Sequence, residues 1–281
     1  MKKIYLLGIL ATIMLAGCSS AKTAESTSAS ADTSAVESKA DETTTAASEN
    51  KTTFTVGFDQ DFPPMGFVGD DGEFTGFDLE LAAEAAKRMG KEIKYQPISW
   101  DAKDMELTSG NIDCIWNGFS IQGREDKYTW SKPYMKNDQV FVVKSDSSID
   151  SIEDLAGKTV EVQTDSSAEA ALKENTELAN TFSKLQTVAD YNTGFMDLEM
   201  GGVDAIAMDS VVANYQITKR GGNGFTVLDT PLSSEEYGIG FKLGNETLKN
   251  EVQKALEDMK ADGTMKTISE KWFGKDVTTL E

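Results

Sequence analysis

The sequence predicts an α/β fold arranged as two lobes, and two observations lead to it. Short apolar strands alternate with amphipathic helices in two separate series, one starting near residue 52 and one near residue 139. Such alternation favours largely parallel sheets with helices packed on their faces. The chain has 281 residues, of which 39% are hydrophobic. This length suffices for one large domain or two ordinary ones.

The first series begins with an alternating strand over residues 54–58. Asp78 has the position of a helix N-cap, and Gly90 has the position at which helices end. The pattern then predicts, in order, a strand at 93–98, a helix at 101–109 and a strand at 112–115. The order is therefore β-α-β-α-β.

The second series starts at a strand over residues 140–143. The pattern continues with a short helix at 151–155, strands at 158–162 and 203–207, helices at 166–173 and 211–218, a strand at 237–243 and a helix at 248–259. Open α/β sheets bind ligands beyond the carboxyl ends of their strands. Two such units predict a ligand cleft between them.

The charge excludes some functions. The formal net charge is −20 and the pI is about 4.4, so binding to nucleic acid is not expected. No histidine occurs, which excludes Ser–His and Cys–His catalysis and histidine-based metal sites. We expect no cofactor and no metal.

The N-terminus has the features of an export signal. Lys2 and Lys3 precede an apolar run over residues 4–16 that is too short to span a membrane. Leu15-Ala16-Gly17-Cys18 resembles the lipobox of bacterial lipoproteins. The resemblance implies a signal peptide over residues 1–17 and a lipid on Cys18, with acyl groups such as palmitate. The alternative is an ordinary signal peptide with a chance cysteine.

Residues 18–51 follow as a polar stretch of Ser, Thr, Ala and Glu. Because it has too few apolar residues to offset the entropy of ordering, we expect a disordered tether to the membrane. Cys114 then has no disulfide partner. Inside an apolar run, it is expected to be a buried small hydrophobe rather than a reactive thiol.

Residues 110–125 have the order of a carboxylate receptor. An apolar strand leads into a small polar turn containing Ser120, and Arg124 follows. The guanidinium group binds a carboxylate through two parallel hydrogen bonds. Only three arginines occur in the chain, so this position is informative. The alternative is a surface ion pair with Glu125 or Asp126.

Several weak motifs occur together in a characteristic order. They are Gly76-Phe77-Asp78-Leu79, Ile112-Asp113, Trp130-Ser131-Lys132-Pro133-Tyr134, Asp204-Ala205 through Asp209, Ala261-Asp262-Gly263-Thr264 and Lys271-Trp272-Phe273-Gly274. From about residue 52 to 274, the chain resembles the substrate-binding proteins of ABC importers for polar amino acids. The resemblance implies a type II periplasmic-binding-protein fold.

In that fold two α/β lobes are joined by a two-strand hinge and close on the ligand. The resemblance implies that lobe 1 comprises residues 52–136 and 237–281. Lobe 2 would comprise residues 137–236.

The resemblance also implies a ligand-binding site for a free amino acid. The carboxylate would be bound by Asn117, Gly118, Ser120 and Arg124 of lobe 1. Ser166 and Ser167 of lobe 2 would approach it at a helix N-terminus, unless they are simple helix caps.

Three further positions would complete the site. Asp209 would accept the α-ammonium group, with a helix cap as the alternative. Phe62 and Trp100 would enclose the ligand side chain, and Asp59 would meet its distal polar group. By contrast, we expect Trp116 and Phe119 to belong to the core.

Two departures from the family pattern concern the site. Arg124 follows Ser120 by four residues, where many relatives have five, so its angle of approach is expected to differ. Glu161 replaces a small residue. Its carboxylate would favour a basic ligand if it faces the cleft, but it could equally face solvent.

The predicted function is capture of a free polar L-amino acid, with a preference for basic ones, by a lipid-anchored extracytoplasmic monomer. The ligand would pass to an ABC permease and its ATPase subunit. The alternatives are a cyclohexadienyl-dehydratase-like enzyme on the same fold and a ligand-binding sensor module.

Overall fold

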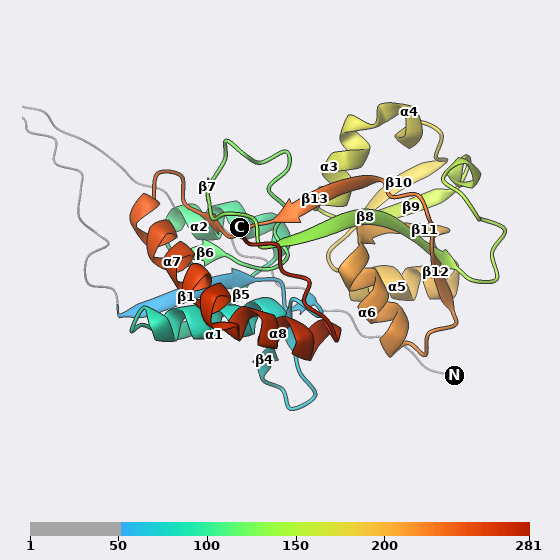
Figure 1. Ribbon diagram of the computed structural model, residues 1–281. Coiled ribbons are helices and arrows are strands. Elements are labelled where there is room, and N and C mark those ends of the chain that lie inside the picture. Colours follow the sequence, from blue (N-terminus) through green and yellow to red (C-terminus); the bar gives the residue numbers. More distant parts are fainter. Residues whose placement is uncertain (1–51) are drawn as a thin grey trace, which may run out of the picture. The chain divides into compact units, whose positions relative to one another are not determined.

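The computed structural model describes residues 52–281, which form two lobes, each with its own sheet (Figure 1). The predicted signal peptide, Cys18 and tether lie outside the described residues. Within residues 52–281, no helix has the length and apolar character needed to cross a membrane.

The first lobe contains a five-stranded sheet in the order β5-β1-β6-β14-β7. Its strands are β1 (Thr53–Phe58), β5 (Glu92–Pro97), β6 (Cys114–Ile115), β7 (Thr129–Trp130) and β14 (Gly240–Phe241). Strand β1 pairs in parallel with β5 and β6, whereas β14 is antiparallel to β6 and β7. Strand β14 arrives late in the sequence, so the chain returns to this lobe.

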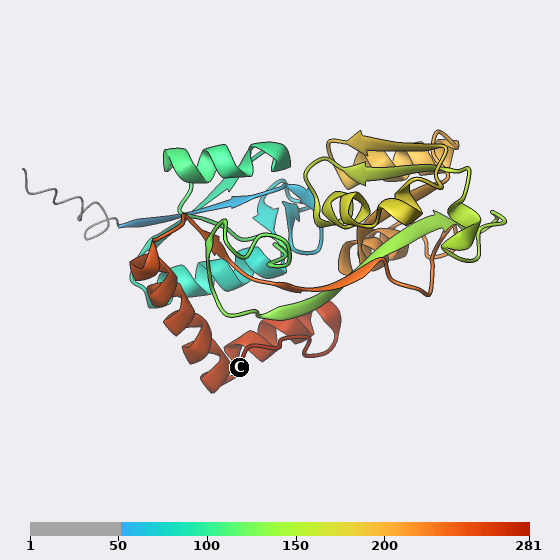
Figure 2. The same cartoon turned by 90° about the horizontal axis from the view of Figure 1, so that it is seen from above.

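Helices cover both faces of the first sheet (Figure 2). They are α1 (Phe77–Arg88), the 3-10 turn η1 (Trp100–Ala102), α2 (Lys103–Ser109), α7 (Glu246–Asp262) and α8 (Thr264–Phe273). Helix α2 lies on one face, and α1, α7 and α8 lie on the other. A small sheet of β2 (Asp61–Phe62), β3 (Gly66–Val68) and β4 (Phe74–Thr75) adjoins the start of α1.

The second lobe contains a six-stranded sheet in the order β10-β9-β11-β8-β12, with β13 also paired to β8. The strands are β8 (Met135–Lys144), β9 (Thr159–Gln163), β10 (Lys184–Val188), β11 (Ala205–Asp209), β12 (Phe225–Val227) and β13 (Ser233–Tyr237). The helical segments are η2 (Glu153–Leu155), α3 (Ser167–Glu174), α4 (Thr176–Ala179), α5 (Tyr191–Met200) and α6 (Ser210–Lys219).

Strands β8 and β13 of the second sheet run side by side toward the first lobe (Figure 1). They are antiparallel, with Ser233 opposite Gln139 and Tyr237 opposite Met135. Beyond Tyr237 the chain enters β14 of the first lobe. This pair of strands therefore has the position of the predicted hinge.

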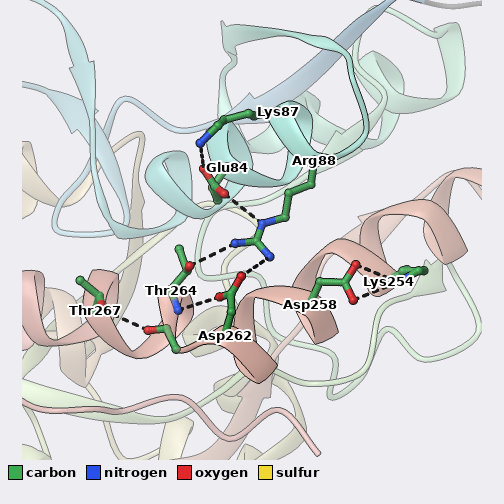
Figure 3. A network of polar contacts seen from close by, with 9 residues as sticks. Glu84, Lys87, Arg88, Lys254, Asp258, Asp262, Thr264 and Thr267 are labelled. Carbon is green, nitrogen blue, oxygen red and sulfur yellow. Dashed lines mark hydrogen bonds and ion pairs between the residues drawn. The ribbon is translucent and has the colours of Figure 1, made fainter.

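A polar network ties α1 to the C-terminal helices of the first lobe (Figure 3). Arg88 forms ion pairs with Glu84 at 2.9 Å and with Asp262 at 2.8 Å, and it donates a hydrogen bond to the hydroxyl of Thr264 at 3.1 Å. Because these partners come from α1, α7 and α8, Arg88 is a structural residue.

The start of α1 differs from the prediction that Asp78 is its N-cap. The N-cap is Gly76, and Asp78 lies in the first turn with no exposed surface. Its carboxylate accepts hydrogen bonds from Gly118 N–H at 2.6 Å and from the Tyr134 hydroxyl at 2.8 Å. Burial raises the pKa of Asp78 to about 7. Asp78 thus anchors the turn at Gly118.

Candidate functional site

A small cavity lies where the two lobes meet. Its lining comprises Phe62, Trp100, Asn117 and Gly118 of the first lobe, and Gln163, Ser166, Ser167 and Asp209 of the second. The volume is about 10 Å³. That is close to the space of one water molecule, so an amino acid enters only if the lobes separate.

The first-lobe floor of this cavity follows strand β6. Asn117 lines the cavity, whereas the predicted residues Ser120 and Arg124 do not. Asn117 Nδ2 and Ser120 Oγ are both buried and have no hydrogen-bond partner among the described residues. Asn117 Oδ1 accepts a hydrogen bond from Asp59 N–H at 3.1 Å. Unpaired buried polar atoms are costly, so Asn117 Nδ2 is suited to receive a polar ligand in this cavity.

Gly118 shapes the floor through its backbone. Its φ of +55° is unfavourable for residues with a side chain, and an added Cβ would lie 2.9 Å from a ring carbon of Phe62. The Gly118 N–H donates to Asp78, so in this arrangement it does not point to a ligand. The predicted residue therefore lines the cavity, but its N–H already has a partner.

Arg124 reaches across to the second lobe. Its guanidinium group donates to Ser167 Oγ at 2.8 Å and to the backbone oxygen of Asp165 at 3.2 Å. It also stacks on Phe119, with Cζ 5.3 Å from the ring centroid. The guanidinium thus lies at the turn that carries Ser166 and Ser167, despite the short spacing from Ser120.

The second-lobe turn precedes helix α3. Asp165 has a φ of +58°, and Ser166 is the N-cap, whose hydroxyl accepts a hydrogen bond from Glu169 N–H at 3.1 Å. Ser166 therefore acts as a helix cap and also lines the cavity. Ser167 lines it too and accepts from Arg124.

Lys103 is a residue of this region that the sequence analysis missed. It is only 1% exposed and forms an ion pair with the carboxylate of Asp165. It also donates to the backbone oxygens of Trp100 and Asp165 at 3.2 and 3.3 Å. Lys103 and Arg124 therefore both connect the first lobe to the turn at Asp165. The sequence around Lys103 does not indicate that its side chain is buried and makes this contact.

Asp209 ends strand β11 at the second-lobe side of the cavity. It is the N-cap residue of α6, but its side chain makes no capping hydrogen bond. Its Oδ1 accepts instead from Asn137, Gln139 and Tyr237 at 2.9, 2.8 and 2.7 Å. Burial, followed by the charge of Glu235, raises the pKa of Asp209 well above its usual range.

A second, wider chamber of about 590 Å³ adjoins the cavity at Trp100, which lines both. Asp59 lines this chamber and accepts hydrogen bonds from Gln163 Nε2 at 2.6 Å and Asp61 N–H at 2.9 Å. Burial raises the pKa of Asp59 to about 6. Asp61, Asp101 and Asp190 also line the chamber, so its wall is acidic.

The aromatic side chains near the site belong partly to the core and partly to the cavity wall. Trp116 and Phe119 are fully buried in the core, as predicted. Phe62 is only 6% exposed and packs on Tyr191, with ring centroids 6.1 Å apart. Phe62 therefore contributes to the core as well as to the cavity wall.

Glu161 follows neither of the two alternatives raised by the sequence. It is 1% exposed, accepts from Gln186 Nε2 at 2.8 Å and lies against Gly194 of α5. It lines neither chamber. Gln163, which no sequence pattern indicated, lies two residues later on the same face of β9 and reaches the cavity.

Among residues 52–281, no group of three or more acidic, cysteine or histidine side chains could hold a metal ion. Cys114 is buried and unpaired, and burial raises the pKa of its thiol.

The chain is similar to known binding proteins over most of its length. It is 34% identical over 276 residues to the L-cystine-binding protein TcyJ of Escherichia coli (strain K12), covering 97% of this chain and 96% of that protein. The L-cystine-binding protein TcyA of Bacillus subtilis (strain 168) is 32% identical over 237 residues, covering 83% and 85%.

The chain is also similar to a solved structure of a substrate-binding protein. The substrate-binding protein of an ABC uptake transporter from Streptococcus pneumoniae, crystallised with histidine, has a TM-score of 0.78 and 37% identity. The match covers 81% of this chain and 95% of that one.

Two family models match the chain. A prokaryotic membrane lipoprotein lipid attachment site matches residues 1–19, which include the predicted lipidation residue Cys18. The model described as bacterial extracellular solute-binding proteins, family 3, matches residues 54–275, which is nearly all of the two lobes. The chain therefore belongs to family 3 of the bacterial extracellular solute-binding proteins and has their type II periplasmic-binding fold.

Proposed function

We propose that this protein captures a free L-amino acid between its lobes, outside the cytoplasm, and delivers it to an ABC permease driven by an ATPase subunit. The observation that carries the proposal is the pairing of opposite chemistries across one interlobe cavity. Asp209 of the second lobe offers a carboxylate to the cavity, and Asn117 of the first lobe offers an amide N–H without a partner. Ser120 and Arg124 lie outside the lining, and we propose that they supply further donors once the lobes separate. These groups match the ammonium and carboxylate of an amino acid.

The proposed ligand is an amino acid with a cationic side chain. Support comes from the acidic wall of the adjoining chamber, where Asp59, Asp61, Asp101 and Asp190 would attract a distal positive charge. Phe62 and Trp100 would enclose the aliphatic part of the side chain.

L-cystine is the second candidate. Its support is the similarity to TcyJ and TcyA over most of the chain. Cystine carries a second ammonium group, which the acidic chamber of about 590 Å³ would also accept.

A calorimetric screen of the purified protein tests both proposals. The probes are the twenty standard L-amino acids and L-cystine. Tightest binding of the cationic amino acids is the expected result. Binding of cystine alone would favour the second candidate, whereas binding of glutamate alone would contradict the acidic-chamber argument. Failure of all twenty standard amino acids and cystine would reject capture of an amino acid.

The proposed site residues are tested by truncation. Arg124→Ala and Asp209→Ala should each weaken ligand binding by at least ~30-fold, because each leaves an opposite charge of the ligand unpaired. Arg220→Ala is the control, since Arg220 pairs loosely with Glu199 at 3.7 Å and lines neither chamber. Unchanged affinity in the Arg124 or Asp209 variant would reject the assignment of that residue.

We further propose the lobe boundaries 52–136 with 237–281 and 137–236, a monomeric state, and anchoring to the membrane through a lipid on Cys18. The lipid attachment match over residues 1–19 supports the anchor. We propose that the protein has no catalytic activity. Turnover of a cyclic dienol by the purified protein would favour the dehydratase alternative instead.

A further inference from the structure

Two buried carboxylates lie together beside the hinge. Asp209 ends β11 and Glu235 lies on β13, and both strands pair with β8. In this register Asp209 is opposite Gln139 and Glu235 is opposite Asn137. Asp209 is 4% exposed and Glu235 is 6% exposed.

The two carboxylates share the same hydrogen-bond donors. Asn137 Nδ2 donates to Asp209 Oδ1 at 2.9 Å and to Glu235 Oε1 at 2.8 Å. Gln139 Nε2 donates to the same two oxygens, at 2.8 Å each. Since both oxygens bond to the same pair of nitrogens, the carboxylates are held as neighbours.

None of the side chains that hydrogen-bond to this pair carries a positive charge. Tyr237 of β13 donates its hydroxyl to Asp209 at 2.7 Å, and Tyr191 of α5 faces the pair as a neutral phenol. From α6, the Ser210 hydroxyl bonds to Asn137. Within the described part of the chain, no lysine or arginine forms an ion pair with either carboxylate. Two buried like charges without a cation are unfavourable, so such a pair retains a proton.

Only one member of the pair reaches the ligand cavity. Asp209 lines it and Glu235 does not. We propose that Glu235 is a positioning residue whose negative charge keeps a proton on Asp209, so that ligand binding at Asp209 releases this proton to solvent. The inference rests on the proposed function, in which Asp209 accepts the α-ammonium group of an amino acid.

The exchange balances in charge. Before binding, the pair holds one proton and one negative charge. When the ammonium group binds, the O–H bond of the pair breaks, the proton passes to the buffer, and the positive charge of the ammonium takes its place. The net charge of the buried site is unchanged, which avoids the cost of a new buried charge.

The exchange predicts how affinity depends on pH. The affinity should rise with pH, by about tenfold per pH unit while one proton is released for each ligand. It should level off once Asp209 is already ionised in the free protein. The ammonium group of the ligand stays protonated from about pH 5 to about pH 6.5, because the pKa of an α-amino group is about 8.

The experiment is isothermal titration calorimetry of the full chain with L-arginine and L-cystine over that range. Each titration is run in two buffers of different ionisation enthalpy, which gives the number of protons released. We expect about one proton from the Asp209–Glu235 pair. Glu235→Gln should abolish this release and flatten the dependence of affinity on pH.

Two further variants test whether the released proton comes from the Asp209–Glu235 pair. Glu236→Gln is the matched control, because Glu236 is the next residue on β13 and has its side chain on the other face of the strand. It should keep the wild-type proton release. Asp59 also faces the cleft and has its pKa raised to about 6, so the series is repeated in an Asp59→Asn background.

The possible results distinguish a failure of the proton-release proposal from a failure of the proposed amino-acid binding. Binding by the wild type without proton release overturns the inference alone, even if Glu235→Gln does not fold. The inference is also overturned if Glu235→Gln lowers affinity equally at every pH and keeps the wild-type proton release. Absence of binding by either probe at every pH overturns the proposed function, and the inference with it.

Discussion

At the scale of single residues, the interlobe cavity depends on backbone conformations that few residues tolerate. Gly118 has a φ of +55° and lies close to Phe62 and Tyr237. Gly123, five residues later, has a φ of +76°, but nothing would lie within 4 Å of an added Cβ. Comparing alanine substitutions at the two positions therefore distinguishes destabilisation by backbone strain from destabilisation by steric overlap.

Gly118→Ala should destabilise the protein more than Gly123→Ala does. We expect Gly123→Ala to lower the free energy of unfolding by about 1 kcal/mol through strain at positive φ. Gly118→Ala should lose roughly 1–3 kcal/mol more, because its methyl group overlaps Phe62. It should also weaken ligand binding by roughly tenfold or more, since the cavity wall must shift. Chemical denaturation and calorimetry measure both effects, and equal losses in the two variants would refute the packing argument.

At the scale of elements, α2 and the turn before α3 form a contact that holds the lobes together. Lys103 at the start of α2 pairs with the carboxylate of Asp165, and Arg124 bonds to Ser167 and to the backbone of Asp165. Asp59 and Asp61 of the first lobe also accept hydrogen bonds from Gln163 and Asn192 of the second. The closed arrangement thus has several polar contacts of its own.

Lys103→Met should favour separation of the lobes. The ion pair with Asp165 is lost, while the Asp165 side chain is 55% exposed and is stabilised by water. We expect binding of the tightest amino acid to weaken roughly 10–150-fold, because one hydrogen bond between charged groups contributes about 1.5–3 kcal/mol. Small-angle X-ray scattering of the ligand-free protein should show a larger radius of gyration. Lys94→Met is the control, because Lys94 lies exposed on β5; a similar effect in both variants would exclude a specific contact.

The sequence predicted those elements whose pattern is local. The strand expected at 93–98 is β5 at Glu92–Pro97, and the helix expected at 248–259 lies within α7. Helix α5 was missed because Tyr191 and Gly194 weaken its helical pattern, although both are buried against the second sheet. Its Asp190 cap was the only local indication.

At the scale of the whole molecule, the cavity could be located from the sequence, but its hydrogen bonds could not. Seven of the predicted ligand residues line one small cavity, since the family motifs fix where the chain turns. The partners of Asp78 and Lys103 lie 40 and 62 residues away. The shared donors of Asp209 and Glu235 arise only when β8 pairs with two strands. Such contacts depend on tertiary packing, which no local pattern reports.

Global stability should depend on pH through Asp78. Its pKa is raised from 3.8 to about 7 in the folded protein because the carboxyl group is fully buried. Between these two values the folded state holds a proton that the unfolded state has lost. The free energy of unfolding therefore falls as pH rises through this window, by up to about 4 kcal/mol.

Asp78→Asn should remove this share of the pH dependence, because an amide has no proton to lose, and its oxygen can still accept from Gly118 N–H. Urea denaturation at about pH 4.5 and about pH 7.5 should show that the wild type loses more stability than the variant over this interval. Asp59, whose pKa is also raised, is present in both proteins and cancels in the comparison. Asp70→Asn in the exposed turn is the control and should keep the wild-type slope. An unchanged slope in Asp78→Asn would mean that Asp78 stays ionised in the core, with its charge stabilised by Gly118 N–H and the Tyr134 hydroxyl.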